Sequence, residues 1–292
     1  MIKMVSLEGA VDLHIHSHPC LIPRLVDDRQ VAQDAAEAGI RAVMLKCHHE
    51  STVSRAYLLD SEFTELRVLG GIVLNNYVGG INPAAVEAAL RMGGKEVWMP
   101  TIDAAHHAKV HGGTGRYDVQ DAGEPSAVTA PGVEVLEDGR LTEAVMAVLD
   151  LIAEHDVILG TCHLAPEEIV ALVKGAKERG VRKVLFTHPY FKVPSVDLDF
   201  IEDMVKLGAV AEFGFCTISP MWHYSTPENV ARSIRAIGAE NCILVSDSGQ
   251  THNPRPVEAL RVFAQCLAEH GITEKDLQTM MVDNPRYLVG LE

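Results

Sequence analysis

Three histidines alternate along a short stretch near the start of the chain, which reads VDLHIHSHP from Val11 to Pro19. If this stretch forms a β-strand, His14 and His16 lie on one face with their Cα atoms roughly 6.5–7 Å apart. Two imidazoles at that separation can bind one metal ion, which lies about 2.0–2.1 Å from each nitrogen. His18 has the same parity but follows the expected strand end, because Pro19 turns the chain out of the sheet. We therefore expect His14 and His16 to bind a metal, and His18 to contact substrate or hold the loop.

Three further side chains of the kind that bind metals follow apolar stretches later in the chain. His163 lies in GTCHL, His188 in FTHPY and Asp247 in VSDSG. Neutral imidazole and carboxylate suit Zn²⁺, Mn²⁺ or Fe²⁺. A bound ion lowers the pKa of its water towards roughly 7, which supplies hydroxide at neutral pH, and Asp247 could accept that water's proton. A single histidine at a strand end is more often structural, so the prediction of a metal site depends on the joint pattern.

The elements that must position these side chains follow a regular alternation. Eight short apolar stretches, each followed by an amphipathic segment, predict parallel strands with right-handed helical crossovers. The stretches are apolar throughout, as expected for strands covered on both faces. This predicts an α/β fold, a (β/α)8 TIM barrel with catalytic groups at the carboxyl ends of the strands. An open doubly wound sheet is the alternative, because a strand count does not establish closure. The predicted strands span residues 11–16, 41–46, 67–75, 95–101, 157–162, 183–188, 209–215 and 242–247.

The segments between the strands carry the marks of helix ends. Acidic residues or proline occupy several first turns, and glycine follows several last turns. They predict helices over residues 27–39, 82–94, 141–155, 165–180, 225–238 and 256–271, and a terminal helix over 273–288. We expect a single domain over residues 1–292, with residues 273–292 forming its C-terminal helical end.

One interval interrupts the alternation. Residues 102–140 follow the fourth predicted strand without a clear helix of their own, and GVEVLEDGRL within them predicts a small hairpin that turns at Asp138 and Gly139. Long loops in compact domains tend to be functional. In a barrel this loop would lie on the active-site face, so we interpret it as a lid or pocket wall.

The composition of the chain argues against nucleic acid and membranes as binding partners. The chain has 292 residues with 47% hydrophobic and 22% charged residues and a formal net charge of −15. A negative field repels nucleic acid, and no apolar run approaches the roughly 20 residues of a membrane helix. The N-terminus lacks the apolar region of a secretory signal, so a cytoplasmic protein is expected.

The six cysteines form no C-x-x-C pair and are expected mostly in the core. A small-molecule substrate is expected, and assembly into a homo-oligomer stays open.

These motifs resemble the amidohydrolase superfamily, metal-dependent hydrolases on a (β/α)8 barrel. The matching motifs are the H-x-H pair after the first strand and the strand-end His163, His188 and Asp247, together with a DNPRYLVGL ending similar to the superfamily's terminal helix. The sequences DLHIHSHP and RAVMLKCHHE also resemble segments of a family of uncharacterised amidohydrolase-like proteins. The resemblance implies that His14, His16 and Asp247 bind a more buried metal and that Asp247 is the general base. It implies that His163 and His188 bind a second metal or, in a one-metal site, bind that metal and polarise an oxyanion.

The chain departs from the two-metal pattern at the fourth predicted strand. VWMPTIDAAHH has no carboxylated lysine or glutamate to bridge two ions, and Asp103 or His106 would be an unusual substitute. A mononuclear site is therefore favoured, although one or two ions per chain, most simply Zn²⁺, fit the resemblance. Lys46, at the end of the second strand, could be a bridging carbamate, stabilise an oxyanion, bind a substrate carboxylate or form a salt bridge.

The predicted reaction is hydrolysis of an amide, cyclic amide or lactone in a small polar or anionic substrate. Metal-activated water would attack the carbonyl carbon, His188 or Lys46 would stabilise the oxyanion, and Asp247 would move the proton. A metal-dependent decarboxylase or another lyase would use the same ligands, and a non-catalytic metal-binding barrel is the third hypothesis. A cysteine nucleophile next to a histidine, such as Cys162 beside His163, is a weaker idea. Polar groups expected near the substrate are His18, Arg24, His49, Tyr190 and Gln250, with Lys192, Trp222 and His223 on the same face.

Overall fold

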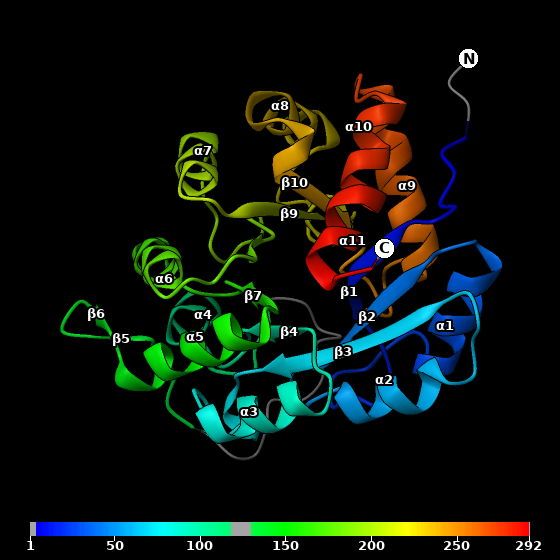
Figure 1. Ribbon diagram of the computed structural model, residues 1–292. Helices are drawn as coiled ribbons and strands as arrows, with labels where there is room; N and C mark the ends of the chain where they lie inside the picture. The colour runs from blue at the N-terminus through cyan, green and yellow to red at the C-terminus, as the bar shows by residue number, and fades with distance from the viewer. Residues whose placement is uncertain (1–3, 118–129, 292) are drawn as a thin grey trace.

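The computed structural model describes residues 4–117 and 130–291 of the chain. Eight parallel strands form one sheet in the order β1-β2-β3-β4-β7-β8-β9-β10, with helices around its outside (Figure 1). All eight predicted strands are confirmed, each within a few residues of its expected limits. They are β1 (Val11–His16), β2 (Ala42–Lys46), β3 (Arg67–Val73), β4 (Glu96–Trp98), β7 (Ile158–Gly160), β8 (Val184–Thr187), β9 (Val210–Gly214) and β10 (Cys242–Val245).

The sheet closes between β1 and the end of β10. The backbone N–H of Asp247 donates to the carbonyl of His14, and that of His16 donates to the carbonyl of Ser248, both at 2.9 Å. These bonds place the first strand beside the last, so the TIM barrel is confirmed and the open doubly wound sheet is wrong. They also attach Asp247 directly to the strand that carries the H-x-H pair.

The barrel strands are buried on both faces. Every strand residue of the eight is buried except Arg67 and Val210, which begin β3 and β9. The surrounding helices cover the outer face with apolar stripes; α5, for example, buries Val145, Val148 and Ile152 at helical spacing. This explains why the strand sequences are apolar throughout, and why polar residues within them point to the barrel interior or its mouth.

The predicted helices are present, and three more complete the strand–helix alternation. The added helix α7 begins after Asp197, whose side chain accepts from the backbone N–H of Phe200, an N-cap signal that the sequence carries. The helices are α1 (Asp28–Glu37), α3 (Pro83–Arg91), α5 (Glu143–His155), α6 (Pro166–Glu178), α8 (Pro227–Ile237) and α9 (Pro256–Glu269), with α2 (Val53–Asp60), α4 (Ala105–His111) and α7 (Leu198–Lys206) not predicted. Single 3₁₀ turns span Asn76–Val78, Phe215–Ile218 and Ala239–Asn241.

The terminal helix differs from the prediction of one regular helix over residues 273–288. It consists of α10 (Glu274–Gln278), a π-helical turn (Thr279–Asp283) and α11 (Asn284–Val289). Pro285 explains the irregularity, because proline has no N–H to donate to the preceding turn.

The interval after β4 contains the predicted hairpin. Strands β5 (Leu136–Glu137) and β6 (Arg140–Leu141) pair antiparallel around Asp138 and Gly139, whose φ angles of 49° and 75° suit a two-residue hairpin turn. Helix α4, which was not predicted, lies earlier in the same interval. Residues 118–129, where part of the expected lid falls, lie outside the described residues. Among the described helices, none is both long and apolar enough to cross a membrane.

Candidate active site

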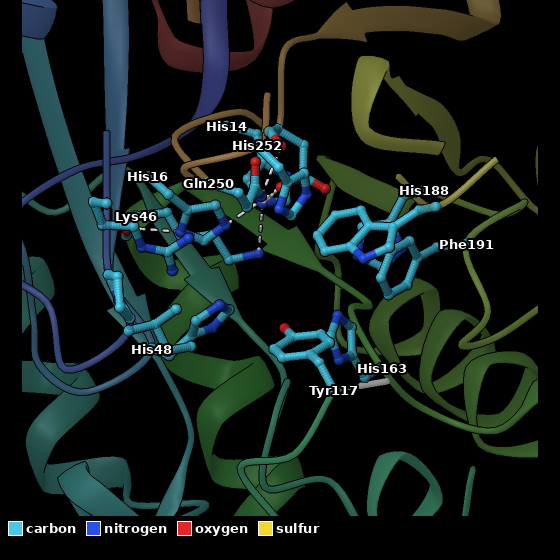
Figure 2. A pocket seen from close by; sticks show the side chains of 15 residues that line it. His14, His16, Lys46, His48, Tyr117, His163, His188, Phe191, Gln250 and His252 are labelled. Atoms are coloured by element: carbon cyan, nitrogen blue, oxygen red, sulfur yellow. Dashed lines mark hydrogen bonds and ion pairs between the residues drawn. The ribbon is translucent and has the colours of Figure 1, made fainter. Parts of the chain in front are cut away.

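The strand ends surround a small cavity at the mouth of the barrel. Its volume of about 30 Å³ has room for a water-sized group. Figure 2 shows His14 and His16 on one side of it and His163 and His188 on another. All five predicted metal-type residues line this cavity: His14, His16, His163, His188 and Asp247. The structure therefore brings together residues from the ends of β1, β7, β8 and β10.

The innermost group consists of His14, His16 and Asp247, which we call the inner site. Their candidate ligand atoms all lie within 4.8 Å of one another. Oδ1 of Asp247 lies 3.2 Å from Nε2 of His14 and 3.3 Å from Nε2 of His16. Two ligands bound tetrahedrally at 2.0–2.1 Å from one ion would be about 3.4 Å apart. The spacing therefore fits a single divalent metal.

Hydrogen bonds at the far ring nitrogens explain which atoms face the ion. Nδ1 of His16 lies 3.2 Å from the carbonyl oxygen of Lys46, which can only accept, so this Nδ1 carries the proton. Nδ1 of His14 lies 2.7 Å from Oε1 of Glu212, an arrangement in which the imidazole donates to the carboxylate. Both Nε2 atoms are then acceptors that point at a third acceptor, the Asp247 carboxylate. Each of these three converging atoms offers a lone pair, which is what a cation site requires.

Burial keeps the histidines in the neutral form that binds metals. Removal from water lowers the pKa of His14 to about 3, and it lowers the pKa values of His16, His163 and His188 well below their usual range. Neutral imidazole has a free lone pair, so no proton has to be displaced from these rings when an ion binds.

Lys46 lies against the inner site. Its Nζ is 3.1 Å from Nε2 of His14 and 5.1 Å from the centre of the Trp98 ring. Two buried carboxyl groups, Glu96 and Glu212, share this part of the barrel, and burial raises the pKa of both, that of Glu212 to about 7. The Lys46 amine thus lies within hydrogen-bond distance of Nε2 of His14, the same nitrogen that would bind an ion.

His163 and His188 face each other across the cavity from the inner site, with ring centres 5.1 Å apart. Nε2 of His107 donates to the carbonyl of Arg116 at 2.7 Å, so Nδ1 of His107 accepts from Nδ1 of His163 at 2.8 Å. This relay leaves Nε2 of His163 as an acceptor. Nδ1 of His188 is buried without a hydrogen-bond partner among the residues that the structure describes.

Comparison with known proteins places the chain in a family. Residues 9–212 match the model of a family of unknown function, DUF6282. The chain belongs to the DUF6282 family. No curated protein matches the sequence.

Solved structures with similar folds span nearly the whole chain. An amidohydrolase from Pseudomonas aeruginosa has a TM-score of 0.63 at 12% identity, with 97% of each chain covered. A putative 2-pyrone-4,6-dicarboxylic acid hydrolase from Pseudomonas putida has a TM-score of 0.60 at 15% identity, with 99% of each chain covered. A 2,6-dihydroxybenzoate decarboxylase from Rhizobium has a TM-score of 0.58 at 13% identity, with 97% of this chain and 99% of that chain covered. They confirm the fold that the amidohydrolase resemblance implied.

Two of the five residues expected near the substrate line the cavity of this DUF6282 protein. These are Arg24 and Gln250. His18 is exposed and its Nε2 accepts from the backbone N–H of Arg24 at 3.3 Å. Tyr190 hydrogen-bonds through its hydroxyl to Ser233 at 2.5 Å, and His49 lies beside Cys20 and Cys47. Pro19 directs the chain away from the mouth, which accounts for the position of His18.

Asp103 and His106, the two residues considered as substitutes for a bridging ligand after β4, do not line the cavity. Asp103 accepts from the backbone N–H of Asn76 at 2.9 Å, and His106 is half-buried on α4. The neighbouring His107 instead supports His163. The one-metal site stays a prediction.

Several residues of the site were not identified from the sequence. Glu212, which orients His14, stands inside AVAEFGF, and a charged residue within a buried strand is a signal that could have found it. Tyr117, Phe191 and His252 line the cavity from segments distant in sequence, and no local pattern identifies them. Trp222, noted as a weaker candidate, also lines it.

The backbone at three strand ends is unusual. Cys162, His188 and Asp247 have φ angles of 54°, 32° and 42°, in the left-handed region that side-chain-bearing residues rarely occupy. Such strain clusters at functional sites, where the surrounding structure maintains it. Here His188 and Asp247 line the cavity, and Cys162 directly precedes His163, which also lines it.

Proposed function

We propose that this protein is a metal-dependent hydrolase that acts at the carbonyl carbon of a small carboxylate-bearing substrate, an amide, cyclic amide or lactone. The observation that carries the proposal is the convergence of two histidine Nε2 acceptors on the Asp247 carboxylate at 3.2 and 3.3 Å. A divalent ion, most simply Zn²⁺, held there by His14, His16 and Asp247 would supply Lewis acidity and an activated water.

The residues around the ion have separate tasks. Asp247 would accept a proton through its carboxylate and return it to the leaving group. His163 and His188 face the reacting carbonyl from the opposite wall. An N–H of His188 would stabilise negative charge on the carbonyl oxygen, whereas Nε2 of His163 is an acceptor. Lys46 also lines the cavity, with its Nζ 3.1 Å from Nε2 of His14, and an N–H of this amine would donate to the same oxygen.

The cavity wall supports an anionic, ring-shaped substrate. The Arg24 side chain is only 6% exposed, and its Nη2 is buried without a hydrogen-bond partner among the described residues. A substrate carboxylate would satisfy this donor. Tyr117 and Trp222 stack with ring centres 6.1 Å apart, and Phe191 packs against Trp222. Two of the structural neighbours are named for ring compounds with carboxylate groups. The cavity has room for a water-sized group, so a ring-sized substrate requires side chains of its wall to move.

Incubation with a panel of lactones, cyclic amides and aromatic carboxylates, with Zn²⁺ or Mn²⁺, tests this proposal. Hydrolysis predicts that oxygen from isotopically labelled water enters the product and that no CO₂ forms. Release of CO₂ without incorporation of solvent oxygen would instead identify a decarboxylase on the same scaffold. Turnover that is unaffected by complete metal removal would contradict both reactions.

A further inference from the structure

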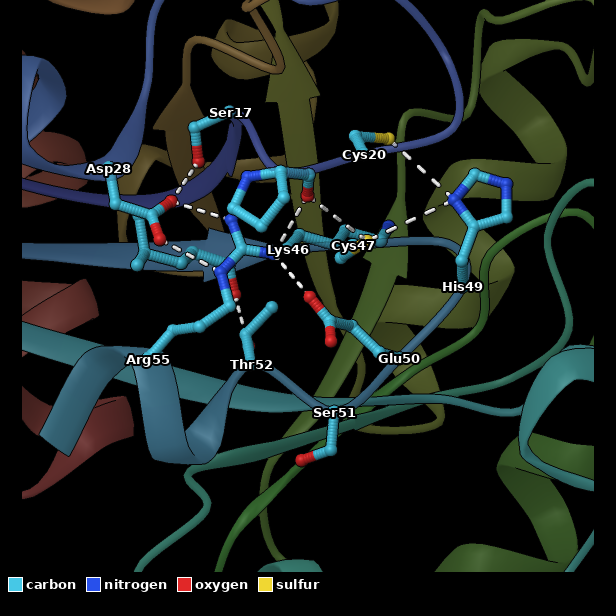
Figure 3. A network of polar contacts seen from close by, with 12 residues as sticks. Ser17, Cys20, Asp28, Lys46, Cys47, His49, Glu50, Ser51, Thr52 and Arg55 are labelled. Atoms are coloured by element: carbon cyan, nitrogen blue, oxygen red, sulfur yellow. Dashed lines mark hydrogen bonds and ion pairs between the residues drawn. The ribbon is translucent and has the colours of Figure 1, made fainter. Parts of the chain in front are cut away.

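A second group of metal-type side chains lies outside the active cavity. It consists of Cys20, Cys47 and His49, which we call the thiolate cluster. The Sγ atoms of Cys20 and Cys47 lie 3.6 and 3.9 Å from Nδ1 of His49, and all three ligand atoms lie within 4.8 Å of one another. Figure 3 shows both sulfur atoms directed at the same ring nitrogen.

The spacing fits a thiophilic metal. With Zn–S near 2.3 Å and Zn–N near 2.0–2.1 Å, a tetrahedral ion separates a sulfur from a nitrogen ligand by about 3.6 Å. Thiolate and imidazole together favour Zn²⁺ over the harder Mg²⁺ or Mn²⁺. Ordinary thiol–imidazole hydrogen bonds could give one such distance, but two sulfur atoms that share one nitrogen match a common ion better.

The cluster is separate from the active cavity, although residues that line the two cavities follow one another at the end of β2. Successive residues alternate there: Lys46 and His48 line the active cavity, whereas Cys47 and His49 line a different, open cavity of about 380 Å³. Cys20 and His49 are half-buried, so an ion can reach them from solvent. The fourth coordination position would face this cavity, where water could occupy it.

The surrounding polar network holds the two cysteine loops together. Arg55 donates to both carboxylate oxygens of Asp28, to the carbonyl of Pro19 beside Cys20, and to Glu50 beside His49. Its side chain is 14% exposed, so these bonds form in a partly dry environment. Nε of Arg24 donates to Sγ of Cys20 at 3.4 Å and so favours the thiolate form, which binds metals. The loops are therefore held in place before an ion arrives.

We propose that the thiolate cluster is a second metal site, at which Cys20, Cys47 and His49 bind one Zn²⁺ with a fourth position open to solvent. Each thiol gives up its proton to solvent as the ion binds. The site would fix the loop after β1 to the loop after β2 beside the active cavity.

Cobalt substitution tests this site independently of catalysis. Under reducing conditions, Co²⁺ bound to thiolates gives a near-ultraviolet charge-transfer band that an ion bound by histidine and aspartate lacks. We expect the full chain to show this band, Cys20→Ser and Cys47→Ser to lose it, and His49→Gln to weaken it. Asp247→Asn, which alters the inner site, should keep the band, as should Cys266→Ser, a half-buried cysteine elsewhere.

Protection from alkylation gives a second readout that needs no substitution. Zn²⁺ should slow the modification of Cys20 and Cys47 in the native chain, measured by peptide mass spectrometry, and leave Cys266 unaffected. If Cys47→Ser fails to fold, the half-buried Cys20→Ser decides. The proposal is overturned if the reduced, folded chain shows no thiolate band with excess Co²⁺, if the band persists in Cys20→Ser, or if Zn²⁺ does not protect the two cysteines.

Discussion

The inner site and the thiolate cluster both use the carboxyl end of β1, yet their environments differ. The inner site offers two imidazoles and a carboxylate, all buried inside the barrel mouth. The thiolate cluster offers two sulfurs and an imidazole, two of them half-buried on an open cavity. His14 and His16 lie on β1 and Asp247 follows β10, whereas the cluster residues follow β1 and β2. Neighbouring strand ends thus serve a dry site suited to polarising a carbonyl and a separate, thiophilic site.

Loss of an inner-site residue should have the largest effect and should leave the thiolate cluster unaffected. Asp247→Asn removes the general base and a metal ligand, so we expect kcat/KM to fall by about a thousandfold. Steady-state kinetics on an active substrate measures this, and the cobalt thiolate band should persist. Cys20→Ser is the matched control, with activity retained and the band lost. A parallel loss of activity in both variants would show that the two sites are not separate.

Changing Glu212, the residue that orients His14, should have an intermediate effect on the inner site. Glu212→Gln keeps the shape of the side chain but removes the charge that orients the imidazole, so we expect inner-site metal affinity to fall by about 10- to 100-fold. Competition with a chelator measures it. Thiolate-cluster affinity should stay unchanged, and equal weakening at both sites would indicate a general loss of structure instead.

Arg24 lines the active cavity and also donates to Cys20 of the thiolate cluster. Arg24→Met removes the buried donor proposed to bind a carboxylate, a charge-assisted hydrogen bond of about 1.5–3 kcal/mol. We expect KM for carboxylate-bearing substrates to rise at least tenfold, while kcat and the KM of an uncharged analogue change little. A uniform effect on charged and uncharged substrates would contradict carboxylate binding.

The smallest effect should follow from loosening the loops of the thiolate cluster. Arg55→Met removes the bonds to Asp28, Pro19 and Glu50, and we expect the free energy of unfolding to fall by about 1–3 kcal/mol. Denaturant titration measures it, and Zn²⁺ should bind less tightly to the cluster while the inner site keeps its affinity. Arg91→Met is the control, because its exposed pair with Glu87 contributes at most about 0.5 kcal/mol.

The sequence predicts the barrel and its inner ligands because their signals are local. An H-x-H pair on a strand, and a histidine or aspartate after an apolar stretch, need only parity and strand order to be placed at the mouth. Chain closure, confirmed by the bonds of Asp247 and His16 to opposite strands, then brings them together.

The remaining parts depend on contacts between distant segments. Glu212 supports His14 across 198 positions of the sequence, and Cys20 meets His49 across 29, so no local pattern pairs them. The cysteines were expected mostly in the core for this reason. The terminal helix is irregular because Pro285 has no backbone N–H to donate. The prediction of one regular helix did not take this into account.

The metal content of a variant that lacks the thiolate cluster tests the central claim most directly. The double variant Cys20→Ser/Cys47→Ser is reconstituted with Zn²⁺, desalted and measured by plasma mass spectrometry, with and without the additional Asp247→Asn substitution. The convergence of His14, His16 and Asp247 predicts one equivalent of zinc in the double variant and its loss when Asp247 is replaced. A folded double variant that retains no zinc, or one that retains it without Asp247, would contradict the inner metal site.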